Sequence, residues 1–157
     1  METGETSIVT SMSLKMRAII VKYDNGTIIG ELHSRYLDAP YVFSDLVNMI
    51  HKMEEIFDTK GFPQAFLSPR SFENGKRTVR NRGNGESPRV EPQNLEGAQK
   101  CSFDISVRFR QNATWQGEIV WIEKNINQDF RSVLEMLKLI DEALAVHHDS
   151  STPVDCE

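Results

Sequence analysis

The sequence predicts an α+β protein in which a duplicated ββα unit forms a four-stranded antiparallel sheet with two helices on one face. Two amphipathic helical segments match each other 87 residues apart, a strand hairpin precedes each segment, and a Gly-Glu-aliphatic triplet recurs at the same spacing. Three features that recur at one spacing indicate an internal repeat. Because a ββα unit of about 45 residues is too small to be very stable alone, the two copies should share one core.

The first hairpin is predicted over residues 19–32. Apolar residues alternate there with polar or smaller ones, as in strands that bury one face. Asn25 and Gly26 lie between the two strands and favour a type I′ turn, because both central residues of that turn need a positive φ. The residues that we expect on the core face are Ile19, Val21, Tyr23, Ile28, Gly30 and Leu32.

The two predicted helices cover residues 43–57 and 130–144. Apolar residues recur in both at positions i, i+3, i+4 and i+7, which is the pattern of a helix that buries one stripe. The matched pairs are Phe43 and Phe130, Leu46 and Val133, Val47 and Leu134, Ile50 and Leu137, Met53 and Ile140, and Phe57 and Leu144.

The second hairpin is predicted over residues 103–121. Its first strand aligns with its counterpart at an offset of 86 rather than 87, which requires one extra residue in the second turn. A bulge residue accounts for the difference and turns Trp115 and Trp121 toward the helices, on the side away from Arg110. Core packing of the tryptophans is therefore favoured over a stacking surface for nucleobases. The residues expected on the core face are Phe103, Ile105, Val107, Phe109, Trp115, Gly117, Ile119 and Trp121.

Composition divides the chain into five stretches. The linker between the two units begins with three phenylalanines and two prolines in residues 61–73, which suggests an ordered loop packed at the edge of the domain. Residues 74–99 hold almost no large apolar side chain, so they cannot bury enough surface to offset their ordering entropy. The expected stretches are a flexible leader over 1–15, the first unit over 16–60, the loop and basic linker over 61–100, the second unit over 101–148 and a flexible tail over 149–157.

The net charge of −5 hides an uneven distribution. Residues 16–60 and 101–148 each hold 5 Lys and Arg against 7 Asp and Glu, whereas residues 61–100 hold 7 against 4. This balance argues against a bulk coat on nucleic acid but allows a local basic contact. No apolar run is long enough to span a bilayer and no signal peptide is found, so we expect a cytoplasmic protein with no membrane partner. Cys101 and Cys156 form no disulfide framework, in keeping with a reducing compartment.

No residue pattern typical of catalysis is found, and we expect neither a cofactor nor a metal. The histidines are scattered, the glycines of the linker lack the strand-loop-helix frame of a phosphate loop, and no serine lies in a nucleophile elbow. The carboxylates lie on outer helix faces, where nothing should perturb their pKa values. An enzyme is therefore disfavoured. The side chains considered in this way are His33, His51, His147, His148, Glu54, Glu55, Asp141 and Glu142.

Two surfaces remain as candidates for binding. The sheet face opposite the helices mixes charges with aliphatic residues, so either a partner or second subunit covers it, or a monomer exposes scattered aliphatics. The linker carries four cations within seven residues, which could neutralise phosphates, dock on an acidic protein or merely keep the chain soluble. The outer sheet face is expected to carry Lys22, Glu31, Arg108, Gln116 and Glu118, with Ile20, Ile29, Val120 and Ile122 among them. The candidate binding residues are Lys76, Arg77, Arg80, Arg82, Arg108 and Arg110.

The run Cys101–Glu123, followed by the run Phe130–Leu137, resembles an uncharacterised family of small proteins. The distinctive motif is Phe109-Arg-Gln-Asn-Ala-Thr-Trp-Gln-Gly117. The family is carried on plasmids, prophages and integrative elements of Gram-positive anaerobic bacteria, and the similarity extends from Met16 to Leu144. The resemblance brings no catalytic residue with it. It implies a genetic context in which small acidic proteins bind and block host defence machinery, CRISPR effectors included.

These observations predict a small, non-enzymatic binding protein, with inhibition of a host defence complex as the role that the resemblance implies. A protein partner is the first expectation, and it would contact the outer sheet face and the basic linker. The alternative is a nucleic-acid-binding accessory protein, in which Arg108, Arg110 and the linker contact phosphates. Whether the chain is a monomer or a homodimer, with or without exchanged halves, is left open.

Overall fold

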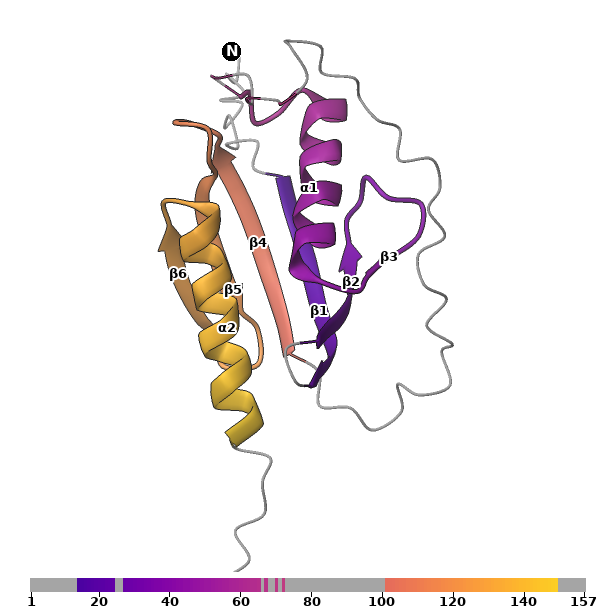
Figure 1. The fold of residues 1–157 in the computed structure, drawn as a ribbon, viewed down its shortest axis with the longest axis vertical. Coiled ribbons are helices and arrows are strands. Elements are labelled where there is room, and N and C mark those ends of the chain that lie inside the picture. Colours follow the sequence, from indigo (N-terminus) through magenta and orange to yellow (C-terminus); the bar gives the residue numbers. More distant parts are fainter. Residues whose placement is uncertain are drawn as a thin grey trace, which may run out of the picture.

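The computed structural model describes residues 14–24, 27–65, 67, 70, 72 and 101–149 of the chain. These residues form an α+β structure with one six-stranded sheet, in the order β3-β2-β1-β4-β5-β6, and two helices (Figure 1). Every neighbouring pair of strands is antiparallel. The elements are β1 (Leu14–Asp24), β2 (Thr27–His33), β3 (Tyr41–Phe43), α1 (Leu46–Lys60), β4 (Cys101–Phe109), β5 (Gln116–Trp121), β6 (Ile126–Phe130) and α2 (Val133–Asp149).

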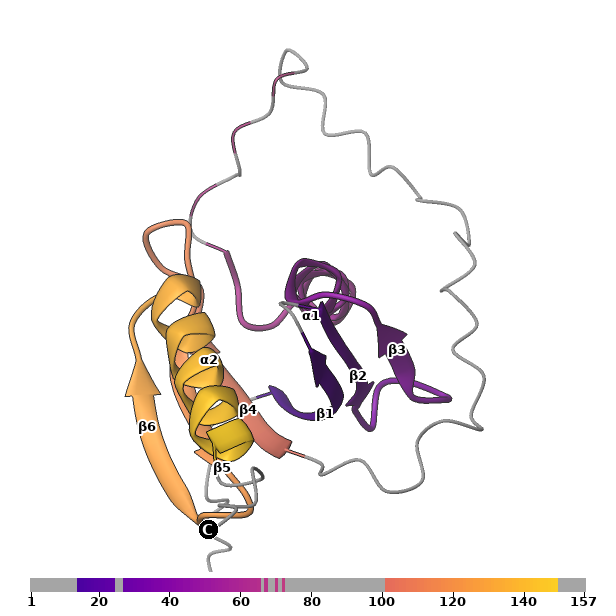
Figure 2. The ribbon, with the colours of Figure 1, turned by 60° about the horizontal axis from the view of Figure 1, so that its bottom comes forward.

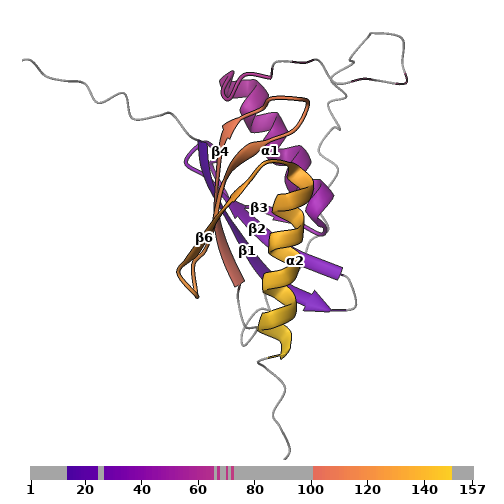
Figure 3. The same cartoon turned by 90° about the vertical axis from the view of Figure 1, so that its left-hand side faces the viewer.

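Both helices lie on the same face of the sheet, and no described element covers the other face (Figure 3). The predicted class, an antiparallel sheet with two helices, is confirmed, but the sheet has six strands rather than four. The two strands that the sequence did not predict are β3 and β6. β3 has only three residues, and the first four residues of β6 are exposed, so neither shows the apolar alternation by which strands are recognised.

Each helix begins with a side chain that caps its first turn. Asp45 Oδ1 accepts the backbone N–H of Asn48 at 2.7 Å, and Ser132 Oγ accepts that of Glu135 at 3.1 Å. α1 ends at Gly61, whose φ of 65° is the left-handed value that favours glycine after a helix. The caps fix where each helix starts over the sheet.

A β-bulge interrupts β1 between Ile20 and Lys22, and another interrupts β4 between Val107 and Phe109. The bulged residues, Val21 and Arg108, are 87 positions apart. The expected offset of 86 is therefore wrong: the first strands align at 87, and the bulge lies inside each strand rather than in the second turn. The turn residues Asn25 and Gly26 themselves lie outside the described residues.

The bulges change which side chains face the core, because one inserted residue moves the following side chains to the other face. Ile20, which was expected on the outer face, is 2% exposed and lies in the core. Ile19, which was expected in the core, lies on the outer face opposite Glu31. Phe109, which was expected in the core, is 54% exposed. Arg110 is buried on the same side as Trp115, contrary to expectation.

The core is one cluster of buried residues between the sheet and the two helices. β1 and β4 pair at the centre of the sheet over seven residue pairs, so the cluster is continuous across both halves of the chain. Trp115 is 2% exposed and Trp121 is half-buried against Phe103, which confirms that both tryptophans turn inward. Phe62 and Pro63 of the following loop pack at the core edge, whereas Leu67 and Phe72 are exposed.

The members of the buried cluster recur at one fixed spacing along the sequence. Each of its members in residues 14–57 has a counterpart in the cluster 87 residues later, and no member is left over. The pairs are Leu14 and Cys101, Met16 and Phe103, Ala18 and Ile105, Ile20 and Val107, Ile28 and Trp115, Leu32 and Ile119, Phe43 and Phe130, Met49 and Met136, Met53 and Ile140, Ile56 and Ala143, and Phe57 and Leu144.

Candidate functional site

The six candidate binding residues do not form one basic patch. Lys76, Arg77, Arg80 and Arg82 lie outside the described residues. Arg108 is half-exposed on the outer face of the sheet, and Arg110, two residues later, is buried against α1. The two sheet arginines therefore lie in different surroundings.

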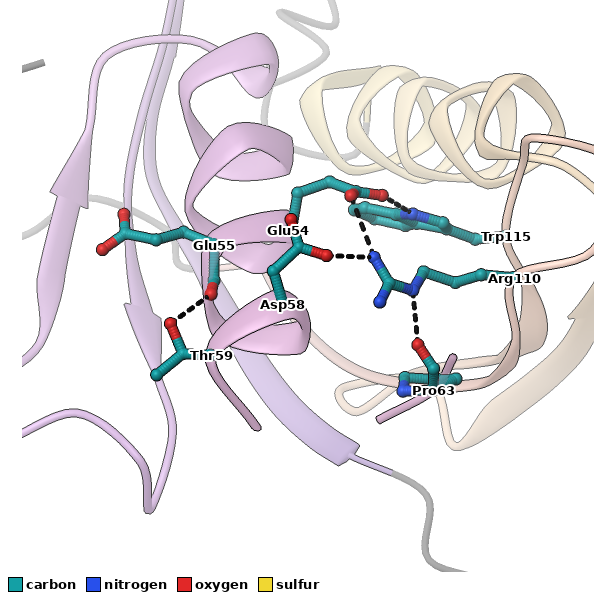
Figure 4. A network of polar contacts seen from close by, with 7 residues as sticks. All are labelled: Glu54, Glu55, Asp58, Thr59, Pro63, Arg110 and Trp115. Atoms are coloured by element: carbon teal, nitrogen blue, oxygen red, sulfur yellow. Dashed lines mark hydrogen bonds and ion pairs between the residues drawn. The ribbon is translucent and has the colours of Figure 1, made fainter. Parts of the chain in front are cut away.

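Arg110 anchors the tip of the β4–β5 hairpin to α1 (Figure 4). Its Nη1 lies 3.1 Å from Glu54 Oε2 and 2.9 Å from Asp58 Oδ1, while its Nε donates to the carbonyl oxygen of Pro63 at 2.6 Å. The guanidinium also lies over the ring of Phe57, 5.6 Å from its centre. Since Arg110 is 6% exposed and its charge is matched by two carboxylates, the expectation that it contacts phosphates does not fit its placement.

Glu54 connects this ion pair to the core. One of its carboxylate oxygens pairs with Arg110, and the other accepts the indole N–H of Trp115. The Trp115 ring meets Phe57 edge-on, with 5.2 Å between ring centres. Glu54 was expected to be a solvated surface carboxylate, but it is held between two side chains of the second half of the chain (Figure 4). These contacts hold the β4–β5 hairpin against α1, which is a structural role.

The rest of the distinctive Phe109–Gly117 segment also serves the fold. Gln116 closes the loop, because its amide accepts from the backbone N–H of Gln111 at 2.9 Å and donates to the carbonyl of Gln111 at 2.9 Å. Thr114 Oγ1 accepts the backbone N–H of Val133, the first residue of α2, at 3.0 Å. Asn112 and Ala113 turn the chain with φ values of 54° and 57°. The segment thus joins the hairpin to both helices.

The outer face of the sheet, meaning the side chains that point away from the helices, is built around Asp104. Arg17 donates to both carboxylate oxygens of Asp104, at 2.7 and 3.1 Å, and Lys15 Nζ lies 3.2 Å from the same group. The Arg17 hydrogen bond is the main reason that the pKa of Asp104 is lowered, with Lys15 adding to the effect and partial burial opposing it. The Asp104 carboxylate is therefore ionised at neutral pH, and Arg17 and Lys15 balance its negative charge.

A second ion-paired group lies toward β6 on the same face. Arg108 Nη2 lies 3.2 Å from Glu118, Arg108 Nη1 lies 3.6 Å from Asp129, and Asn127 donates to Glu118 at 2.9 Å. Aliphatic side chains lie beside these groups, because Ile19 pairs with Glu31 and Val120 pairs with Asp104 and Asn127. Ser106, which pairs with both Lys15 and Glu118, lies between the two groups. The outer face is a mixed surface in which the arginines already have acidic partners.

Few side chains among the described residues are placed to bind a metal ion or to act as a nucleophile. No group of three His, Cys, Asp or Glu side chains that could hold a metal ion is found in this part of the chain. The thiol of Cys101 is buried, and burial, helped by the charge of Glu123 and opposed by the nearby indole of Trp121, raises its pKa to about 12, so it is not a reactive thiolate. Neither described helix has the length and apolar character needed to cross a membrane.

Sequence reasoning missed the partners of Arg110. Asp58 lies four residues after Glu54, about one helical turn, so both carboxylates lie on the same side of α1. That spacing is visible in the sequence, but the matching cation is not, because Arg110 faces the core only if the bulge falls at Arg108.

Comparison of the chain with protein-family models, with curated proteins and with solved structures found no match.

Proposed function

We propose that this protein acts by binding another protein through the outer face of its sheet, and not by catalysis. One observation carries the proposal: a six-stranded sheet leaves one whole face without a covering element among the described residues (Figure 3). That face combines paired charges with aliphatic side chains and the 54% exposed ring of Phe109. Protein interfaces have this mixed composition, in which apolar contacts supply affinity and paired charges supply specificity.

The charges on the outer face favour a protein over a nucleic acid. Arg17 is bound by Asp104, and Arg108 lies between Glu118 and Asp129. A phosphate that approached either arginine would have to compete with these carboxylates and would be repelled by them. A protein surface can instead match such alternating charges with its own. Following the resemblance drawn from the sequence, we propose that the partner is a component of a host defence or regulatory system.

Site-specific photo-crosslinking tests the use of this face. A benzoylphenylalanine placed at Ile29, on the outer face, should crosslink to one discrete protein in an extract of the source cells. The same group at Val47, which is 60% exposed on α1, is the matched control and should give no such product. Loss of the Ile29 product when Phe109→Asp is added would tie the contact to the outer face. Equal products from both positions, or none from Ile29, would contradict the proposal.

The alternative function, nucleic-acid binding by the linker, follows from its four clustered cations. Its residues lie outside the described part of the chain, so it is argued from the sequence alone. Binding to labelled single- and double-stranded DNA and RNA, followed by fluorescence anisotropy, discriminates between the two. Phosphate binding should weaken steeply with salt and vanish when Lys76, Arg77, Arg80 and Arg82 are all changed to Ala. Absence of binding even at low salt would eliminate this alternative.

We also infer that the two halves of the chain are copies of one unit, which is βββα rather than the ββα expected. The matched 87-residue spacing of the buried cluster supports this, as does the same spacing between the two bulges. Arg17 and Asp104 are also 87 residues apart and pair with each other across β1 and β4. At this pair, in the middle of the β1–β4 ladder, a position in one unit lies opposite its own equivalent in the other unit, and the first unit has a cation there where the second has an anion.

A further inference from the structure

The two edges of the sheet differ in how well they are protected against pairing with another strand. β3 forms one edge, and it has three residues preceded by Pro40, which lacks a backbone N–H. Short strands and prolines are common ways to block an edge. β6 forms the other edge, and it has five residues in regular register with β5. It contains no proline or bulge and a single charged residue, Asp129, and no strand of the described residues pairs with its outer side.

β6 lies on the rim of the molecule, and no other described element lies beyond it (Figure 2). Its first residue, Ile126, is 49% exposed although it pairs with Trp121 on the helix side of the sheet. An aliphatic side chain at an open edge favours a strand partner that can cover it.

We propose that β6 pairs antiparallel with β6 of a second copy of this chain, so that two sheets join into one across a two-fold axis. The sequence of β6 is complementary to itself when the axis passes through Gln128. In that register Gln128 faces the partner's Gln128, Asn127 faces the partner's Asp129, and Ile126 faces the partner's Phe130.

This register has the largest overlap that two five-residue strands can have, and it places no like charges opposite each other. Moving the axis to Asp129 would bring two aspartates together, which is unfavourable in a cross-strand pair. The amides of Asn127 and Gln128 can donate across the axis. Because the β3 edge is protected, the pairing closes at a dimer and does not continue into a filament.

The proposal concerns a surface distinct from the outer face, so either one can fail without the other. A single five-residue strand pair buries less area than a standard interface, so the dimer should be weak and should depend on concentration. Such a dimer would place two outer faces side by side and would present a partner with two copies of the proposed binding surface.

Sedimentation velocity over a range of concentrations, up to roughly 1 mM, tests the dimer. Gln128→Lys and Gln128→Glu each put like charges on the axis and should each weaken dimerisation by about fivefold or more, because the charges would lie only a few ångströms apart. An equimolar mixture of the two variants should dimerise at least as well as the wild type, since Lys then faces Glu. Gln64→Lys, an exposed loop position, is the control for added charge and should leave the dimer unchanged.

Recovery in the mixture separates pairing at β6 from damage to the fold, because a misfolded variant would not be rescued by another. A wild type that stays monomeric would overturn the proposal and leave the edge to a strand from a different protein. Larger, open-ended oligomers, or dimers that neither variant weakens, would also overturn it.

Discussion

Arg110 shows how a single side chain fixes the hairpin tip against the helix. Its Nη1 donates to Glu54 and Asp58, and its Nε donates to the Pro63 carbonyl. Removing it frees two carboxylates that face each other along α1 and opens a space beside Phe57. The neighbouring Arg108 carries the same charge on the outer face but is half-exposed and paired only at the surface.

The contrast between these two arginines gives the first prediction. Arg110→Ala should lower the free energy of unfolding by about 2 kcal/mol or more, because a buried, multiply bonded charge is lost. Arg108→Ala should cost about 0.5 kcal/mol or less, as expected for an exposed ion pair. Urea unfolding of both variants provides the comparison. Equal losses would mean that Arg110 does not hold the hairpin to α1.

Asp104 gives a prediction on pH dependence. Its folded pKa is lowered, chiefly by Arg17, so its contribution to stability is complete above the ordinary Asp pKa of about 4 and is lost as the pH falls through the lowered value. Asp104→Asn should therefore destabilise the protein at pH 7 by about 1 kcal/mol, and the difference from wild type should shrink below about pH 4. Thermal unfolding across that pH range measures it. If the stability difference between the variant and the wild type grew as the pH fell, the pKa of Asp104 would not be lowered in the folded protein.

At the scale of elements, the two helices and the four long strands could be predicted from the sequence, because Met53, Phe57 and their counterparts follow the helical period. The predicted helix starts were wrong, since Phe43 and Phe130 end β3 and β6 and the helices begin three residues later. Val47 and Leu134, which were expected in the buried stripe, are exposed. The short strand β3 and the polar strand β6 could not, since neither shows alternation. The bulges could not be placed either. One extra residue was expected in the second turn only, whereas a bulge interrupts each first strand. Hydrophobicity alone does not reveal these bulges, and the bulge at Arg108 decides whether Arg110 is buried.

The close approach of strands at two glycines gives a prediction for the sheet. A Cβ on Gly30 would lie 2.5 Å from both the carbonyl oxygen of Ile19 and the ring of Phe43, and one on Gly117 would lie 2.0 Å from the carbonyl oxygen of Ser106. Because the obstacle in each case includes backbone, Gly30→Ala and Gly117→Ala should each destabilise by about 1–3 kcal/mol.

The same substitution at Gly61 provides a control of a different kind. No atom lies within 4 Å of a Cβ at Gly61, so any loss there comes from its left-handed φ of 65° alone. Chemical denaturation of the three alanine variants compares them. Unchanged stability for both Gly30→Ala and Gly117→Ala would show that the strands lie further apart than described.

For the whole molecule, the shared core predicts one cooperative unfolding transition. Met53 on α1 and Ile140 on α2 are both fully buried members of the same cluster, 87 residues apart. Met53→Ala and Ile140→Ala should each lower stability by about 2–5 kcal/mol and should shift the entire transition. Circular dichroism and tryptophan fluorescence should report the same midpoint. Two separated transitions in either variant would mean that the halves have independent cores.

The functional proposal at this scale depends on the outer face being a binding surface. The candidate site could be predicted only in outline. Arg108 and its nearer partner Glu118 were both assigned to that face, but the second partner, Asp129, lies on β6, a strand that the sequence does not reveal. The bulge likewise brings Phe109 to the outer face instead of the core.

The most direct measurement is the affinity of the crosslinked partner, once identified and purified, for variants of the two faces. Calorimetric titration should show that Ile29→Asp and Phe109→Asp weaken binding by at least about tenfold, which corresponds to roughly 1.4 kcal/mol. Val47→Asp and Leu134→Asp, at exposed positions on the two helices, should bind like the wild type. Loss of affinity in the helix variants, with binding kept in the sheet variants, would contradict the account.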